Sequence, residues 1–120
     1  MRPDDPDAAR LYDMLTYARE TVETLAGVTF ASYLKDKNLR LATERRIEII
    51  GQAANNVSRP FQDAHPEIPW SRIIAQRNVL AHEYGEIKDE IIFRNATTHV
   101  PRLIEMLRPL VPPEPPEDTA

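Results

Sequence analysis

The sequence predicts an all-α fold, an up-and-down helical bundle of four principal helices in one domain. Apolar residues recur at steps of three and four over long segments, which is the periodicity of a helix face. The chain has only three glycines in 120 residues, and it lacks the alternating β-branched runs that are typical of strands. A chain of this length is expected to bury a single core.

The first helix is expected from about residue 7 to residue 26. Its apolar stripe consists of Leu11, Leu15, Ala18, Val22 and Leu25. Asp7 is placed to cap the start of this helix, and Gly27 is placed to end it. Residues 28–38 then read as a turn that holds at most one short helical turn.

The second helix is expected from about residue 39 to residue 57. Its stripe consists of Ile47, Ile50, Ala54 and Val57. Gly51 lies in the middle of this helix, where glycine costs about 1 kcal/mol relative to alanine. We therefore expect another backbone to pack closely against Gly51.

Residues 58–70 form a connector whose three prolines argue against a regular helix. A third helix is expected to begin near Pro69 and to run to Tyr84, with Gly85 as its end. A fourth is expected to begin near Lys88, and Pro101 should kink it. Residues 1–108 are thus interpreted as the helical domain, and residues 109–120 as a flexible tail rich in proline and glutamate.

Composition narrows the function classes. The net charge of −4 argues against broad, non-specific nucleic-acid binding. The absence of cysteine excludes a disulfide framework and a zinc–thiolate site. No apolar run approaches the roughly 20 residues that cross a bilayer, and the acidic start does not resemble a signal peptide. These features favour a cytoplasmic protein without membrane contact.

One short stretch, IAQRNVLAHEY, gathers groups that could do chemistry. On the expected helix, Arg77 and Tyr84 share a face, and so do Asn78 and His82. Arg77 and His82 are separated by roughly 140°. The stretch is either a functional site or an ordinary solvated helix face.

The same Arg-x-x-x-x-His separation recurs at Arg94 and His99, and Arg59 and His65 are one residue further apart. We interpret His99 as an ordinary helix residue, because no other reactive group lies near it in the sequence. His65 is interpreted in the same way, because it lies in the proline-rich connector. The spacing of Arg77 and His82 therefore does not identify a site by itself.

The side chains of this stretch suit phosphodiester cleavage. Histidine titrates near neutral pH and can act as general acid or base. Arginine binds phosphate oxygens and stabilises charge in the transition state. RNA supplies its own nucleophile, the 2′-hydroxyl, so the reaction needs no metal or other cofactor. Such a mechanism prefers two proton-transfer groups, which a two-fold homodimer with two copies of His82 in one cleft would supply.

The chain resembles the HEPN superfamily, and within it the HepT-type toxins of prokaryotic toxin–antitoxin pairs. The resemblance covers about residues 8–108 and is carried by RRIEIIGQAANNVS, HPEIPWSRIIAQRNVLAHEYGEI and VPRLIEML. Within the second of these segments, Arg77, Asn78, His82 and Tyr84 match the Arg-x-x-x-x-His-x-Tyr motif of the family. In one position the chain departs from the family, which often has Gly-Glu-Ala where this sequence reads Gly51-Gln52-Ala53.

The resemblance implies a type VII-like toxin, a metal-independent ribonuclease that acts on RNA such as tRNA or mRNA as a homodimer. Arg77 and His82 would be catalytic, and Asn78 would support them. It also implies a minimal nucleotidyltransferase antitoxin that can transfer AMP to Tyr84. If an acid at position 52 orients Arg77 or His82 in the family, Gln52 weakens activity in this chain.

Two alternatives to the ribonuclease toxin remain open. The chain could be a catalytically quiet subunit that binds nucleotide or supports dimerisation in a nucleotidyltransferase complex. It could also be a plain helical dimerisation domain in which Trp70 and Tyr84 belong to the core. The basic residues Arg40, Arg45 and Arg46 are candidates to guide RNA or to bind the antitoxin, against a plain solvated face.

Overall fold

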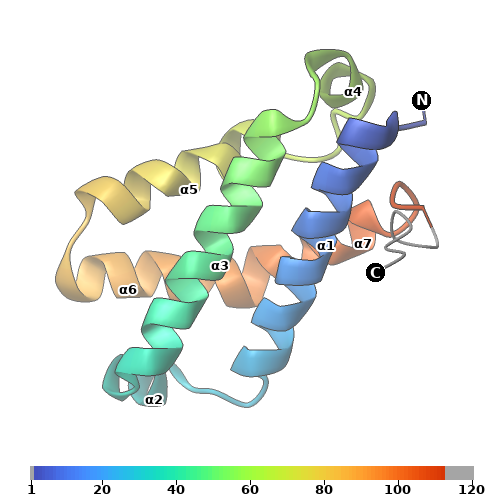
Figure 1. The fold of residues 1–120 in the computed structure, drawn as a ribbon. Coiled ribbons are helices and arrows are strands. Elements are labelled where there is room, and N and C mark those ends of the chain that lie inside the picture. The colour runs from blue at the N-terminus through green and yellow to red at the C-terminus, as the bar shows by residue number, and fades with distance from the viewer. Residues whose placement is uncertain (1, 113–120) are drawn as a thin grey trace, which may run out of the picture.

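A computed structural model describes residues 2–112 and confirms the all-helical class, with no strand in that range (Figure 1). The elements are α1 (Asp5–Leu25), α2 (Phe30–Lys35), α3 (Lys37–Asn56), α4 (Arg59–Ala64), α5 (Trp70–His82), α6 (Gly85–Arg94), the π-helical turn η1 (Asn95–His99) and α7 (Val100–Leu107). This division is finer than the four principal helices expected, because both connectors contain a short helix and the last helix is interrupted.

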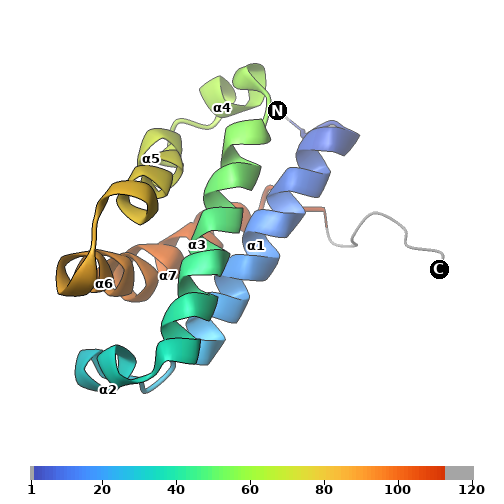
Figure 2. The same ribbon diagram turned by 60° about the vertical axis from the view of Figure 1, so that its left-hand side comes forward.

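The core lies between α1, α3 and the rod formed by α6, η1 and α7. Helices α1 and α3 run side by side, α5 packs on the other flank of α3, and the α6–α7 rod crosses behind them (Figures 1 and 2). The largest fully buried apolar side chains of the core are Leu11, Met14, Tyr33, Phe61, Ile68, Ile92 and Leu107. Helix α5 contributes little to this core, with only Trp70 and Ile73 buried. Most of its surface therefore remains available at the outside of the bundle.

The start of α1 differs from the sequence prediction. Asp4, and not Asp7, caps the helix, because its carboxylate accepts a hydrogen bond from the backbone N–H of Asp7 at 2.8 Å. Asp7 is instead buried and accepts from the backbone N–H and the hydroxyl of Ser58, at 2.8 and 2.6 Å. Its role is tertiary, since it joins the start of α1 to the end of α3.

The connector after α3 contains a helix, contrary to the prediction. Pro60 occupies the first turn of α4, where a missing N–H has no consequence, and the other two prolines follow the helix. Ser58 caps α4 and Phe61 is fully buried beneath it. Trp70, at the start of α5, is buried and donates from its indole nitrogen to the carbonyl of His65 at 3.0 Å.

Pro101 follows a π-helical turn that interrupts the last helix. The turn before it, η1, is π-helical, and the N–H of Val100 donates to the carbonyl of Asn95. A proline ring clashes with the carbonyl four residues earlier and cannot donate to it. Widening the turn relieves this conflict while α6 and α7 continue as one rod.

Contacts with the core continue beyond residue 108. Leu110 and Val111 pack against the core, and both backbone N–H groups donate to the carbonyl of Leu107. The rest of the expected tail, residues 113–120, lies outside the described residues. No helix within residues 2–112 is both long and apolar enough to span a membrane.

Candidate active site

The site is built on the contact between α3 and α5, which Gly51 makes possible. Gly51 is buried, and a Cβ atom added there would lie 3.2 Å from the carbonyl oxygen of Ile73. The close backbone approach expected at this glycine is therefore present. The same added atom would lie 3.5 Å from the Cγ of Arg77. The side chain of Arg77 thus begins directly against the backbone of α3.

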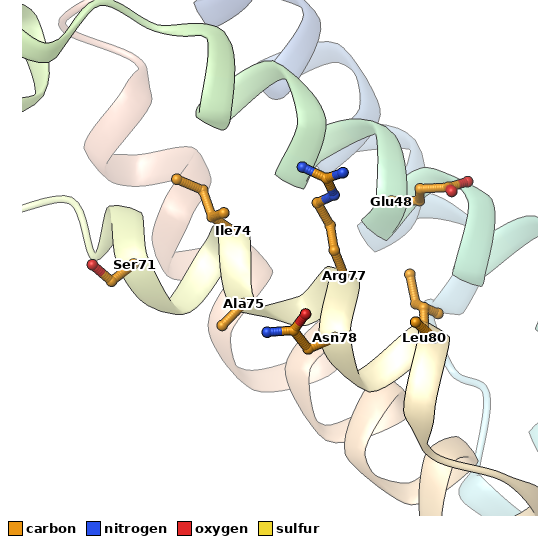
Figure 3. A pocket seen from close by; sticks show the side chains of 8 residues that line it. Glu48, Ser71, Ile74, Ala75, Arg77, Asn78 and Leu80 are labelled. Carbon is orange, nitrogen blue, oxygen red and sulfur yellow. The ribbon is translucent and has the colours of Figure 1, made fainter.

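An open pocket of about 780 Å³ lies beside this contact (Figure 3). Its walls are formed by Glu48 of α3 and by Ser71, Ile74, Ala75, Arg77, Asn78, Leu80 and Ala81 of α5. Arg77 extends from α5 towards α3, while Asn78 lies on the neighbouring face of α5 (Figure 3). Neither side chain makes a hydrogen bond or an ion pair with any residue from 2 to 112. Both can therefore contact a ligand without first breaking an internal bond.

His82 lies at the edge of this site and not inside the pocket. It is the last residue of α5, is exposed, and is absent from the pocket walls. It follows Asn78 by one helical turn, so the two share a face as the sequence predicted. A single chain thus presents Arg77 and Asn78 together but does not enclose His82 with them.

Tyr84 corrects the expected extent of the third helix. Helix α5 ends at His82, and Glu83 and Tyr84 are extended, with φ/ψ of −99°/151° and −134°/159°. Gly85 then turns the chain into α6 with a φ of +61°, which glycine adopts without strain. Tyr84 therefore does not continue the stripe of Arg77. Its side chain is 79% exposed, which excludes the interpretation of Tyr84 as a core residue, whereas Trp70 is buried.

Ion pairs hold the α5–α6 corner against α3. Lys88 contacts Glu44 at 3.2 Å, and Arg40 contacts Asp89 at 4.0 Å, with all four side chains at most a quarter exposed. Arg40 also donates to the carbonyl of Leu34. The pKa of the nearby Tyr33 is raised, first by burial and then by the carboxylates of Glu44 and Asp89. The corner that carries His82 and Tyr84 is thus anchored by polar contacts near the buried Tyr33, whose ring contacts Phe30 and Phe93.

The acid that faces the pocket is Glu48 and not the residue at position 52. Gln52 is exposed and lines a separate depression with Arg10 and Asp13 of α1. Glu48 precedes it by one helical turn and lines the pocket, but its carboxylate pairs with Arg45 at 2.7 Å. Helical periodicity alone does not predict that Glu48 lines this pocket. Its contact with the site arises because α5 packs along the side of α3 that carries it.

The three arginines of α3 are paired with acidic residues of the chain. Arg46 pairs with Glu20 at 3.2 Å, and Arg40 and Arg45 have the partners given above. These pairs neutralise the charge that made the three residues candidates to guide RNA. Among residues 2–112, no three His, Cys, Asp or Glu side chains form a group that could hold a metal ion.

Comparison with known proteins gives this site a family. Residues 14–110, which include the whole α3–α5 contact and the α6–α7 rod, match the family described as "Ribonuclease HepT-like". The chain belongs to the HepT-like ribonuclease family. This confirms the resemblance to HepT-type proteins of the HEPN superfamily.

Individual relatives agree with the family assignment. The chain is 32% identical over 95 residues to "Probable ribonuclease HepT" of Thermococcus cleftensis, which covers 76% of this chain and 86% of that protein. It is 32% identical over 103 residues to "Putative RNase MJ0127" of Methanocaldococcus jannaschii, covering 86% and 85% of the two chains. It is 31% identical over 93 residues to "Putative RNase TTE0752" of Caldanaerobacter subterraneus subsp. tengcongensis, covering 78% and 83%. A comparison with solved structures finds no significant match.

Proposed function

We propose that this HepT-like chain is a ribonuclease toxin that cleaves RNA without a metal ion, with Arg77 and His82 as its catalytic residues. The observation that carries the proposal is the exposed position of Arg77, Asn78 and His82 along one helix of a ribonuclease family member. Helix α5 contains no acidic residue, although the whole chain has a net charge of −4. No side chain of this helix therefore repels a bound phosphate.

The proposed reaction is a transesterification within the RNA strand. The 2′-oxygen attacks the adjacent phosphorus, the bond to the 5′-oxygen breaks, and a 2′,3′-cyclic phosphate and a 5′-hydroxyl result. Arg77 binds the non-bridging oxygens and stabilises the charge that they gain in the transition state. His82 takes the proton from the 2′-hydroxyl or donates one to the leaving 5′-oxygen. Asn78, one turn before His82, supports the bound phosphate or the imidazole.

The position of His82 supports a two-fold homodimer as the active form. Arg77 and Asn78 line the pocket of one subunit, while His82 is exposed at its edge. A second copy across a two-fold axis would add a second His82, so that one imidazole acts as base and the other as acid. Tyr84 and Ile87, at the same corner, are 79% and 64% exposed. Large apolar side chains at this exposure favour a protein contact.

The exposure of Tyr84 also supports control by a nucleotidyltransferase antitoxin. Its hydroxyl is accessible on the extended segment between α5 and α6, two residues from His82. Transfer of AMP to this oxygen would place a bulky anion beside the phosphate-binding groups, where it repels RNA. Co-expression with the antitoxin should therefore add the mass of AMP to the parent chain and abolish cleavage. A Tyr84→Phe variant should not gain this mass.

The deciding experiment is cleavage of total RNA and tRNA by purified chain in the presence of chelator. The parent should yield 2′,3′-cyclic phosphate ends, and His82→Ala should reduce the rate at least about 100-fold, the usual contribution of a proton-transfer group. His65→Gln is the matched control. His65 follows Arg59 by six residues, much as His82 follows Arg77 by five, but it lies in the connector outside the proposed site.

Cleavage by His82→Ala at the parental rate would exclude the catalytic role of His82. No cleavage by parent protein that mass spectrometry shows to be unmodified at Tyr84 would instead favour the quiet nucleotide-binding or dimerisation subunit.

A further inference from the structure

His99 lies near arginines of three different elements. It lines one small cavity together with Arg72, and Arg94 and Arg102 lie five residues before it and three residues after it along the α6–η1–α7 rod. The pKa of His99 is lowered from its ordinary value, first by burial and then by the positive charges of Arg72, Arg102 and Arg94. Arg72 belongs to α5, Arg94 to α6 and Arg102 to α7, while His99 lies in η1. The tertiary structure therefore brings residues spread over 31 positions of the sequence into one basic cluster.

Two of these cations are uncompensated. Arg94 pairs with Glu90 at 3.0 Å, but Arg72 and Arg102 form no ion pair with any residue from 2 to 112. Both are exposed. They differ in this respect from the arginines of α3, each of which has an acidic partner. In a protein with a net charge of −4, these two exposed and unpaired guanidiniums are available to bind an anion.

The cavity beside Arg72 and His99 is too small to hold an anion, so an anion would contact the residues at its opening. Arg72, Gln76, Asn95 and His99 border a cavity of only about 20 Å³ with an apolar floor. Such a volume has room for about one water molecule, so no ligand group of phosphate size fits inside. Gln76 Oε1 and His99 Nδ1 are buried there without a hydrogen-bond partner among the described residues. An anion would therefore bind on the guanidiniums outside the cavity.

Helix α5 connects this cluster with the candidate active site. Arg72 precedes His82 by ten residues, about 15 Å along the helix axis and roughly 80° around it. The surface between them carries no acidic side chain, because α5 has none. A strand bound at Arg77 and His82 can thus continue over the outer face of α5 to Arg72 without meeting a like charge from this helix.

We propose that Arg72 and Arg102 bind backbone phosphates of the RNA strand beyond the scissile bond. This inference rests on the proposed ribonuclease function and extends its substrate contact to the α5–η1–α7 surface. The contact is to phosphate and not to bases, so it adds affinity equally for all sequences. Arg72 and Arg102 are binding residues, whereas Arg77 and His82 carry the chemistry.

The test is binding of a fluorescent single strand of about 12 nucleotides, a length within the usual site sizes, with 2′-O-methyl groups that prevent cleavage. Affinity of the full chain is measured by anisotropy over a range of KCl concentrations. The double variant Arg72→Gln/Arg102→Gln should bind about tenfold more weakly at low salt. The slope of log affinity against log salt should fall by about 0.7 for each phosphate that the variant no longer neutralises.

Two controls separate a local contact from a general charge effect. Arg108→Gln removes a cation at the C-cap of α7, the helix that carries Arg102. That cation is paired with Glu105 at 3.3 Å and lies roughly 120° away from Arg102 around the helix axis. The variant should leave affinity unchanged. Arg72→Lys/Arg102→Lys keeps the charge and should retain most of the salt slope.

Parental affinity and slope in the double Gln variant would overturn the proposal, and so would an equal loss in Arg108→Gln or no RNA binding by the parent. Cleavage of unmodified RNA, measured in parallel with His82→Ala, distinguishes the two proposals. Cleavage that depends on His82, with binding indifferent to Arg72 and Arg102, would refute this inference alone. Binding that depends on the two arginines without any cleavage would refute the ribonuclease proposal alone.

Discussion

Gly51 of α3 lies against Arg77 of α5, so that a Cβ at position 51 would be 3.5 Å from the Cγ of Arg77. The same atom would be 3.2 Å from the carbonyl oxygen of Ile73, tighter than most such contacts. The backbone of one helix therefore forms the support on which the arginine of the other rests. The position of the guanidinium depends on the absence of a side chain from α3.

Gly51→Ala should separate stability from activity. Alanine gains about 1 kcal/mol of helix propensity, but α5 must move by a few tenths of an ångström to accept the methyl group. We expect the free energy of unfolding to change by less than about 1 kcal/mol, while RNA cleavage falls because Arg77 shifts. Denaturant unfolding and initial cleavage rates measure the two effects.

Gly27→Ala is the complementary control. Gly27 has a φ of +74° and no atom within 4 Å of an added Cβ, so the substitution should destabilise by about 1 kcal/mol through backbone strain. Cleavage should remain at the parental rate. If Gly51→Ala cleaves RNA as fast as the parent, the close contact between Gly51 and Arg77 is not needed for cleavage.

Lys88→Met should loosen the corner that carries Tyr84. Lys88 and Glu44 are 24% and 18% exposed, so their pair is less screened than a surface pair, and its loss should cost about 1 kcal/mol. Amide hydrogen exchange should accelerate at residues 83–88. Glu105→Gln, which breaks the exposed Arg108–Glu105 pair, should change neither stability nor exchange at the corner. Unchanged exchange in Lys88→Met would show that packing alone holds the corner.

Asp7→Ala should destabilise the fold by about 2 kcal/mol. The substitution removes both hydrogen bonds from Ser58 and leaves its partly buried backbone N–H without an acceptor. The exposed Asp13 of the same helix provides a control, and Asp13→Ala should stay within about 0.5 kcal/mol of the parent. Equal unfolding free energies for the two variants would contradict the tie between α1 and Ser58.

His99 should make stability depend on pH. Its pKa in the folded chain is below the ordinary 6.5, because of burial first and the neighbouring arginines second. At low pH the unfolded chain therefore binds more protons than the folded chain. The stability that depends on a neutral His99 is fully present above about pH 6.5 and is lost as the pH falls through the pKa of the folded state. His99→Gln should lose less stability than the parent between about pH 7.5 and about pH 5. Identical losses in chemical denaturation would refute this role.

The sequence predicted the helical class and the main apolar stripes because both depend on local periodicity. The stripes of α1 and α3 are visible in the spacing of Leu11, Leu15, Ile47 and Ile50, and all four are buried. Gly51 could be singled out as well, since a glycine inside a helix is costly unless something approaches it. Motif matching to a family predicted a site of Arg77, Asn78, His82 and Tyr84 without any coordinates, and the assignment of these residues to one site stays a prediction.

Errors arose where one local rule was applied without its context. Three prolines suggested an irregular connector, but proline is tolerated in a first turn, and α4 forms with Pro60 there. Asp7 looked like a cap, yet Asp4 caps α1 while Asp7 is bound by Ser58. The helical wheel joined Tyr84 to Arg77, because periodicity does not show that α5 ends at His82.

The sequence by itself determined the helices, their core faces and the residues of the motif. The tertiary structure alone decided which acid faces the pocket, which arginines are neutralised and which remain unpaired. Arg40 and Arg46 find Asp89 and Glu20 across helix contacts, whereas Arg72 and Arg102 have no such partner among residues 2–112. The physical reason is that helix periodicity operates over a few residues, while charge compensation depends on side chains that meet only when distant segments pack.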